Sequence, residues 1–109
     1  SEFFFDFDSY EIDDTQRINI TNLSKILMKY EYIKINIDGH ASSEGESDYN
    51  MLLSNRRSIN IKNSLIQDGI NDSRLDVKAF GEELPSYANM PLSERKKNRR
   101  VIISVDMDL

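Results

Sequence analysis

Cysteine is absent from this chain of 109 residues, and its one histidine is His40. The lack of cysteine excludes disulfides, thiolate zinc sites and a cysteine nucleophile. His40 has no second histidine and no cysteine with which to share a metal or a catalytic role. We therefore expect a structural or loop-packing role for His40, and we predict neither a metal nor a cofactor.

Long apolar runs are missing too: the longest are far too short to span a bilayer, and no signal peptide is recognisable at the start. Acidic residues outnumber basic ones by 19 to 14, and the net charge of −5 disfavours binding to nucleic acid or to an anionic membrane surface. The length fits one domain with a single core. We expect residues 1–109 to be such a domain, excised from a longer protein.

The residue groups that usually carry catalysis are missing as well. Ser42, Ser43 and Ser54 do not lie in a Gly-x-Ser-x-Gly elbow, and we expect Ser54 to cap or pack inside its helix. The acidic pairs Asp13-Asp14 and Glu82-Glu83 are adjacent in sequence, so their carboxylates point apart and are poorly placed for general acid–base work. We predict that the chain is not an enzyme.

What the sequence does contain is a regular succession of strand and helix patterns. An aromatic strand is predicted over residues 3–7 and a helix over 14–30, with Asp13-Asp14-Thr15 capping the start of that helix. Strict alternation of isoleucine with polar residues predicts a second strand, over 33–38, with one buried face.

The second half of the chain repeats this succession. A polar loop is predicted over residues 39–46, then a helix over 47–68 that Gly69 ends. Alternation predicts two more strands, over 75–79 and from Val101 onward. Helical connections favour right-handed crossovers. The predicted fold is α/β, an α+β sandwich of the order β-α-β-α-β-(turn)-β, with a mixed four-stranded sheet and two main helices on one face.

A charged residue stands in the apolar face of the second helix. Leu53, Arg57, Ile61 and Leu65 follow one another at four-residue steps and form one slanting row. An unpaired guanidinium in such a place is costly, so Arg57 needs a partner. Either it pairs with a structural carboxylate or extends to solvent, or it meets an anionic ligand at the mouth of the preceding loop, because arginine suits bidentate carboxylate recognition.

The loop that begins at Gly39 supports the ligand hypothesis. It leaves the end of a strand and enters the start of a helix, which is where open α/β sheets bind ligands. Backbone N–H groups near a helix N-terminus also suit a carboxylate.

The motifs of this region resemble those of a known family. Gly39-His40-Ala41-x-x-x-Gly45, followed by Tyr49-Asn50-x-x-Leu53-Ser54-x-x-Arg57, resembles the OmpA-like C-terminal domain, the peptidoglycan-binding module also found in Pal lipoproteins and MotB-type stator proteins. Phe5-Asp6-Phe7-Asp8-Ser9, Gly81-Glu82-x-x-Pro85 and Asn98-Arg99-Arg100-Val101 extend the likeness over nearly the whole chain, in the right order.

The resemblance implies non-covalent binding of the peptidoglycan stem peptide, typically through diaminopimelate. It implies that Arg57 meets the ligand's carboxylate, that Asn50 braces the loop and contacts the ligand, and that Asp8 lines the same pocket. Ala41, in the loop motif, belongs to the same implied set. The resemblance also implies a periplasmic location, with attachment to the outer membrane through the rest of the protein.

One position departs from the family pattern. The family aspartate that meets the ligand's ammonium, three residues after the loop's first glycine, is Ser42 here. A hydroxyl supplies no charge, and the lost bond is worth about 1.5–3 kcal/mol, or roughly one to two decades in affinity. Either Glu44 supplies the missing carboxylate, or the affinity is lower, or the preferred ligand differs.

A basic cluster and two classes of function stay open. Lys96, Lys97, Arg99 and Arg100 either form a solvated face, or one arginine turns toward the sheet and frames the pocket or meets wall carboxylates. The domain either tethers an envelope protein to peptidoglycan, or it is a protein-interaction or assembly domain that keeps the fold while wall binding is weakened or lost through the change at Ser42.

Overall fold

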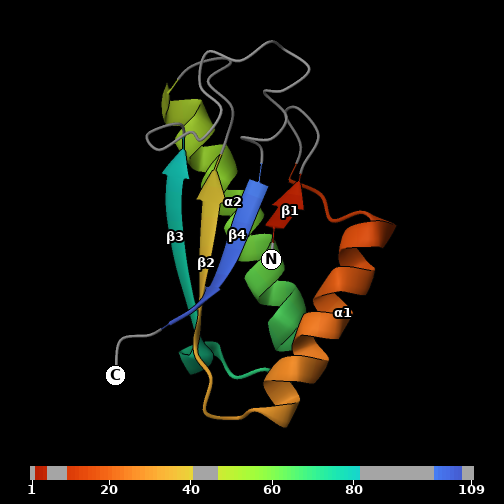
Figure 1. The fold of residues 1–109 in the computed structure, drawn as a ribbon. Helices are drawn as coiled ribbons and strands as arrows, with labels where there is room; N and C mark the ends of the chain where they lie inside the picture. Colours follow the sequence, from red (N-terminus) through yellow and green to blue (C-terminus); the bar gives the residue numbers. More distant parts are fainter. Residues whose placement is uncertain (1, 5–9, 41–46, 82–99, 107–109) are drawn as a thin grey trace.

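In a computed structural model of the chain, residues 2–4, 10–40, 47–81 and 100–106 are described. Strands and helices follow one another in the predicted order (Figure 1). Their bounds are β1 Glu2–Phe4, α1 Asp14–Lys29, β2 Ile35–His40, α2 Ser47–Gln67, the 3₁₀ turn η1 Asp72–Arg74, β3 Leu75–Gly81 and β4 Arg100–Val105.

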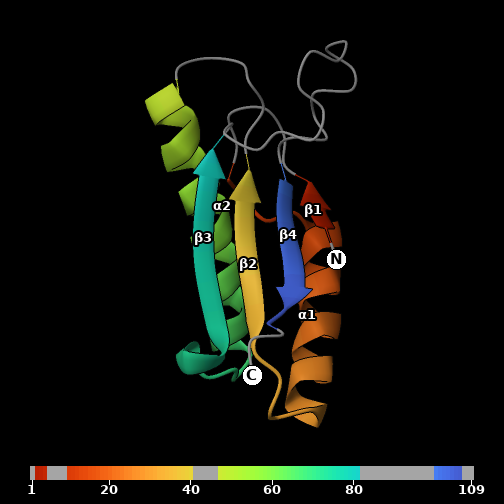
Figure 2. The same cartoon turned by 60° about the vertical axis from the view of Figure 1, so that its left-hand side comes forward.

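The four strands form one mixed sheet in the order β1-β4-β2-β3. β2 and β3 are parallel, as expected for strands joined by a helical crossover, and β4 runs antiparallel to both of its neighbours, β1 and β2. Both helices lie behind the sheet in Figure 2, on the same face. The predicted α/β fold, with two helices on one face of a mixed four-stranded sheet, is confirmed.

The start of α1 and the end of α2 follow from local sequence. Asp13 is the N-cap of α1: its carboxylate accepts the Gln16 backbone N–H at 2.7 Å, and the Gln16 side chain accepts the Asp13 N–H at 2.9 Å. Gly69 follows α2 with φ of 104°, and the Ile70 N–H bonds the Leu65 carbonyl at 3.0 Å. The predicted cap and stop are therefore confirmed.

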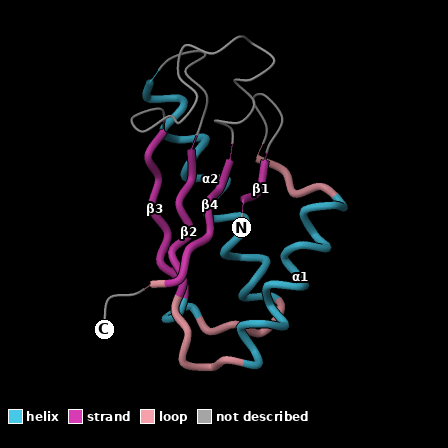
Figure 3. Tube along the Cα trace, viewed as in Figure 1, coloured by secondary structure: helices cyan, strands magenta, loops and turns pink. Residues whose placement is uncertain are grey.

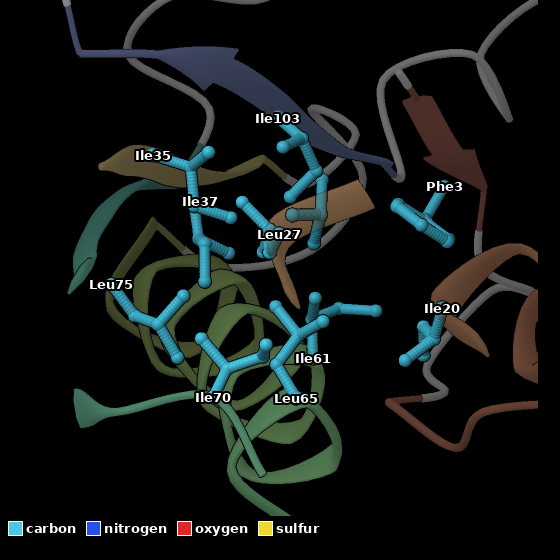
Figure 4. Close-up of a cluster of buried hydrophobic side chains, with 11 residues drawn as sticks. Phe3, Ile20, Leu27, Ile35, Ile37, Ile61, Leu65, Ile70, Leu75 and Ile103 are labelled. Carbon is cyan, nitrogen blue, oxygen red and sulfur yellow. The ribbon is translucent and has the colours of Figure 1, made fainter. Parts of the chain in front are cut away.

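The core lies between the sheet and the two helices (Figure 4). Alternate residues of the strands meet the inward faces of α1 and α2, as period-2 and period-3.6 patterns require. The cluster of buried apolar side chains consists of Phe3, Ile20, Leu27, Ile35, Ile37, Ile61, Leu65, Ile70, Leu75, Val101 and Ile103. None of the helices in the described ranges is long and apolar enough to cross a membrane.

The predicted start of the polar loop at Gly39 is wrong. β2 continues through Gly39, which pairs with both Ala79 of β3 and Val101 of β4, and ends at His40. A glycine that breaks the isoleucine alternation is a typical loop signal. Here it serves a close approach of two backbones instead. The remainder of the predicted loop and of the first strand lies outside the described residues.

Candidate functional site

The candidate site lies at one edge of the sheet. β1, β2 and β3 all end at this edge, β4 begins there, and α2 begins beside it (Figure 3). Strand ends next to a helix N-terminus are the usual place for a ligand in an α/β sheet. The described residues nearest to the edge include His40 at the end of β2 and Arg100 at the start of β4.

Arg57 is completely buried, at 0% exposure, in the row that the sequence predicted. Its neighbours in the row, Leu53, Ile61 and Leu65, are buried as well. Complete burial excludes the alternative that Arg57 extends to solvent. One Nη of its guanidinium donates a hydrogen bond to the backbone carbonyl of His40 at 3.1 Å, so Arg57 reaches from α2 to the end of β2.

Gly39 allows α2 to lie close enough for that contact. A Cβ atom at position 39 would overlap the backbone oxygen of Ser54 and the hydroxyl oxygen of Ser58. Both serines are fully buried, and their hydroxyls are used within the helix: Ser54 donates to Met51 O at 2.9 Å and Ser58 to Ser54 O at 3.1 Å. The prediction that Ser54 packs inside its helix is confirmed.

His40 is buried beside a cation and is neutral. Burial lowers its pKa, and the nearby Arg100 lowers it further, to about 4. A neutral ring in a packed strand end agrees with the structural role that the sequence predicted. Among the described residues no group of three or more histidine, aspartate or glutamate side chains is arranged to hold a metal ion.

Arg100, the member of the basic cluster that the structure describes, is buried. It is the first residue of β4, precedes the Val101–Gly39 pair and is 2% exposed. The alternative of a solvated face is therefore wrong for Arg100. Lys96, Lys97 and Arg99 lie outside the described residues. Alternation from Val101 and Ile103 places position 100 on the face of the strand opposite to the core, so the pattern alone gives no sign of its burial.

Asp38 lies near the same end of β2 and is a residue of the candidate site that the sequence did not predict. Its Oδ1 is buried and has no hydrogen-bond partner in the described part of the chain. Burial raises the pKa of this carboxyl. Lys78, which is paired with Asp38 on the neighbouring strand β3, lowers this pKa by attracting the carboxylate. The alternating pattern assigned Asp38 to the polar face of the strand and gave no sign that this end of the face is covered.

The other predicted contacts lie outside what the structure describes. Asp8, Ala41, Ser42 and Glu44 are not among the described residues. Asn50 belongs to α2, two turns before Arg57, and only its backbone is described. The structure therefore brings Arg57 and the start of α2 to the predicted edge of the sheet.

Comparisons with known proteins agree with this arrangement. The profile of the OmpA family matches residues 4–99. Outer membrane porin F of Pseudomonas fluorescens is 33% identical over 102 residues, which cover 94% of this chain and 31% of the porin. The peptidoglycan-associated lipoprotein of Mesorhizobium japonicum is 29% identical over 102 residues, covering 94% of this chain and 61% of the lipoprotein. The chain thus spans less than two thirds of the length of these relatives.

Solved structures share the fold over almost the whole chain. The peptidoglycan-associated lipoprotein from Burkholderia pseudomallei superposes with a TM-score of 0.92 at 25% identity, covering 96% of this chain and 89% of the other. The C-terminal domain of Helicobacter pylori MotB superposes with a TM-score of 0.89 at 27% identity, covering 99% of this chain and 85% of the other.

Proposed function

This chain belongs to the OmpA family, and from that premise we propose that it binds the peptidoglycan stem peptide without catalysing a reaction. In this role it tethers an envelope protein to the cell wall from the periplasm. The names of two of its relatives, the peptidoglycan-associated lipoproteins, support the assignment. The family membership itself does not specify which part of the wall is bound.

The observation that carries the proposal is the placement of Arg57. A completely buried guanidinium at the edge of the sheet, bonded to the carbonyl of His40, is held in one orientation by the packed α2–β2 contact. A held arginine loses little further freedom on binding, and a guanidinium can meet a carboxylate through a planar pair of donors. We assign to Arg57 the recognition of the diaminopimelate carboxylate.

The ammonium half of the ligand meets Ser42 in this proposal. Ser42 offers a hydroxyl where the family has a carboxylate, so its bond to the ammonium is not charge-assisted on the protein side. We propose that Asp8, Ala41 and Asn50 complete the pocket, and that Glu44, a carboxylate two residues after Ser42 in the sequence, compensates for it.

Co-sedimentation with purified peptidoglycan sacculi tests the proposal. The wild type is expected in the pellet at low salt, and Arg57→Ala is expected in the supernatant because the carboxylate loses its partner. Arg56→Ala is the matched control, since Arg56 is the adjacent, exposed arginine of the same helix. Circular dichroism of both variants verifies that they fold. Wild type that stays in the supernatant would contradict wall binding.

A Ser42→Asp variant separates the two classes of function. If the wild type fails to pellet and Ser42→Asp pellets, the missing carboxylate is the cause and the alternative, an interaction or assembly domain with lost wall binding, is supported. The compensation by Glu44 has its own test: Glu44→Gln is expected to weaken diaminopimelate binding in a calorimetric titration, and an unchanged affinity would exclude that role.

A further inference from the structure

β3 forms the longer of the two edges of the sheet. In the strand order β1-β4-β2-β3 it has β2 on one side, and none of the described strands pairs with it on the other side (Figure 2). An edge strand presents backbone N–H and C=O groups that can pair with another chain. The opposite edge strand, β1, has only three residues, whereas β3 has seven and no proline. The described sheet can therefore accept a further strand along β3.

The outer face of β3 carries one charge of each sign. Leu75 belongs to the core and Val77 packs against it, so Asp76 and Lys78 lie on the opposite face of the sheet, which neither helix covers. Their side chains are 60% and 56% exposed, and their charged atoms are 4.0 Å apart, at the limit of an ion pair. An exposed pair of this kind is worth little, so both charges are available to a partner.

We propose that β3 pairs with β3 of a second copy of the chain, antiparallel about a two-fold axis at Val77, so that the two sheets become continuous. Asp76 then lies directly opposite Lys78 of the partner subunit, and Lys78 lies opposite Asp76 of the partner subunit. Opposite charges in such cross-strand pairs are stabilising. Antiparallel pairing reverses the second copy, so the two sheet edges that hold Arg57 lie at opposite ends of the dimer. The pairing itself does not rest on wall binding.

The charges of β3 complement the same chain in this register and not in the neighbouring ones. An axis at position 76 would bring two copies of Asp76 together, and an axis at position 78 would bring two copies of Lys78 together; both arrangements are repulsive. The axis at Val77 makes two ion pairs instead. On the helix-covered face it places Leu75 opposite Ala79 of the partner subunit, so that apolar residues also meet apolar residues.

Charge reversal tests the pairing and its register. In sedimentation equilibrium the unmodified chain is expected to convert from monomer to dimer as its concentration rises to about 1 mM. Asp76→Lys and Lys78→Asp each turn both ion pairs into like-charge pairs, and each is expected to weaken the dimer about tenfold. An equimolar mixture of the two variants is expected to form a heterodimer as tight as the wild-type dimer, because lysines of one variant then face aspartates of the other.

Lys25→Asp is the matched control for these variants. Lys25 is exposed on α1, and its reversal changes the net charge as Lys78→Asp does, so it is expected to leave the dimer unchanged. Circular dichroism verifies that all three variants fold. A wild type that is monomeric throughout the concentration range would overturn the proposal, and so would a mixture that associates no better than its two components.

Amide hydrogen exchange locates the contact. The amides of β3 are expected to exchange more slowly as the concentration rises and the dimer forms, while those of β1, at the other edge of the sheet, are expected to exchange at an unchanged rate. A dimer in which the exchange of β3 does not change would place the interface elsewhere and overturn the proposal.

Discussion

Gly39 of β2 lies against Ser54 of α2 so closely that a methyl group at position 39 would overlap the serine's backbone oxygen. Because the obstructing atom is backbone, a rotamer change cannot relieve the overlap. Helix and strand would have to separate, and the contact from Arg57 to His40 lies on the same stretch of the two elements.

Gly39→Ala is therefore expected to lower the free energy of unfolding by about 2–3 kcal/mol, the cost of overpacking a rigid contact. Urea denaturation measures it. Gly69→Ala is the comparison: its φ of 104° is strained for alanine, at a cost of about 1–2 kcal/mol, but its nearest neighbour is Met28 Cε at 3.6 Å. A Gly39→Ala variant as stable as wild type would contradict the close approach.

Arg74 stabilises the C-terminal end of α1 and the turn that follows it. Its guanidinium donates to the carbonyls of Leu27 and Tyr30, both at 2.8 Å, and to that of Ile33 at 3.0 Å. Arg74→Met is expected to cost about 2–3 kcal/mol, because three acceptors lose a charged donor. Arg17→Met, at an exposed position of α1, is expected to change stability by less than about 0.5 kcal/mol. Equal midpoints in urea for the two variants would disprove this role.

Ser24 and Asp68 link the two helices. The Ser24 hydroxyl, 2% exposed, donates to Asp68 Oδ2 at 2.7 Å. Ser24→Ala is expected to cost about 1–2 kcal/mol, and a double-mutant cycle with Asp68→Ala should show that the two changes are coupled. Thr21→Ala on the same helix removes only an exposed hydroxyl bonded to Arg17 O and should be almost neutral. Additive effects in the cycle would argue against the link.

His40 gives the fold a pH dependence of known sign. Its pKa falls from 6.5 to about 4 on folding, so the folded state binds the imidazole proton only at a lower pH than the unfolded state does. The contribution of His40 to the free energy of unfolding is fully present above pH 6.5 and is lost as the pH falls toward 4. The loss reaches about 3 kcal/mol, at 1.36 kcal/mol per pKa unit. Because His40 is the one histidine of the chain, its NMR titration is free of overlap.

His40→Gln isolates this contribution. The raised pKa of Asp38 acts in the opposite sense, because the folded state then binds the carboxyl proton more tightly and gains stability as the pH falls. Subtracting the pH profile of His40→Gln from that of wild type removes the Asp38 contribution, which both share. A His40 pKa near 6.5 in the folded protein would show that the ring is not desolvated.

Local patterns were enough to predict much of this protein. The order of helices and strands, the cap at Asp13, the stop at Gly69 and the place of Arg57 in an apolar row of α2 all depend on residues within a few turns of each other. Periodicity and capping act over such distances, so a single sequence carries them. The motifs likewise indicated the family that the profile match shows.

Long-range contacts decided the rest. Gly39 is a strand residue and not a loop residue because it pairs with Ala79 and Val101, and Ser54, fifteen positions later, leaves no room there for a side chain. Arg100 and Asp38 are brought to the same end of the sheet by the pairing of β4 with β2, and the burial of Arg100 and of Asp38 Oδ1 is a property of the assembled fold. Desolvation and close packing depend on which segments come into contact in the folded chain. The sequence by itself determined the helices and strands, and only the tertiary structure decided these contacts.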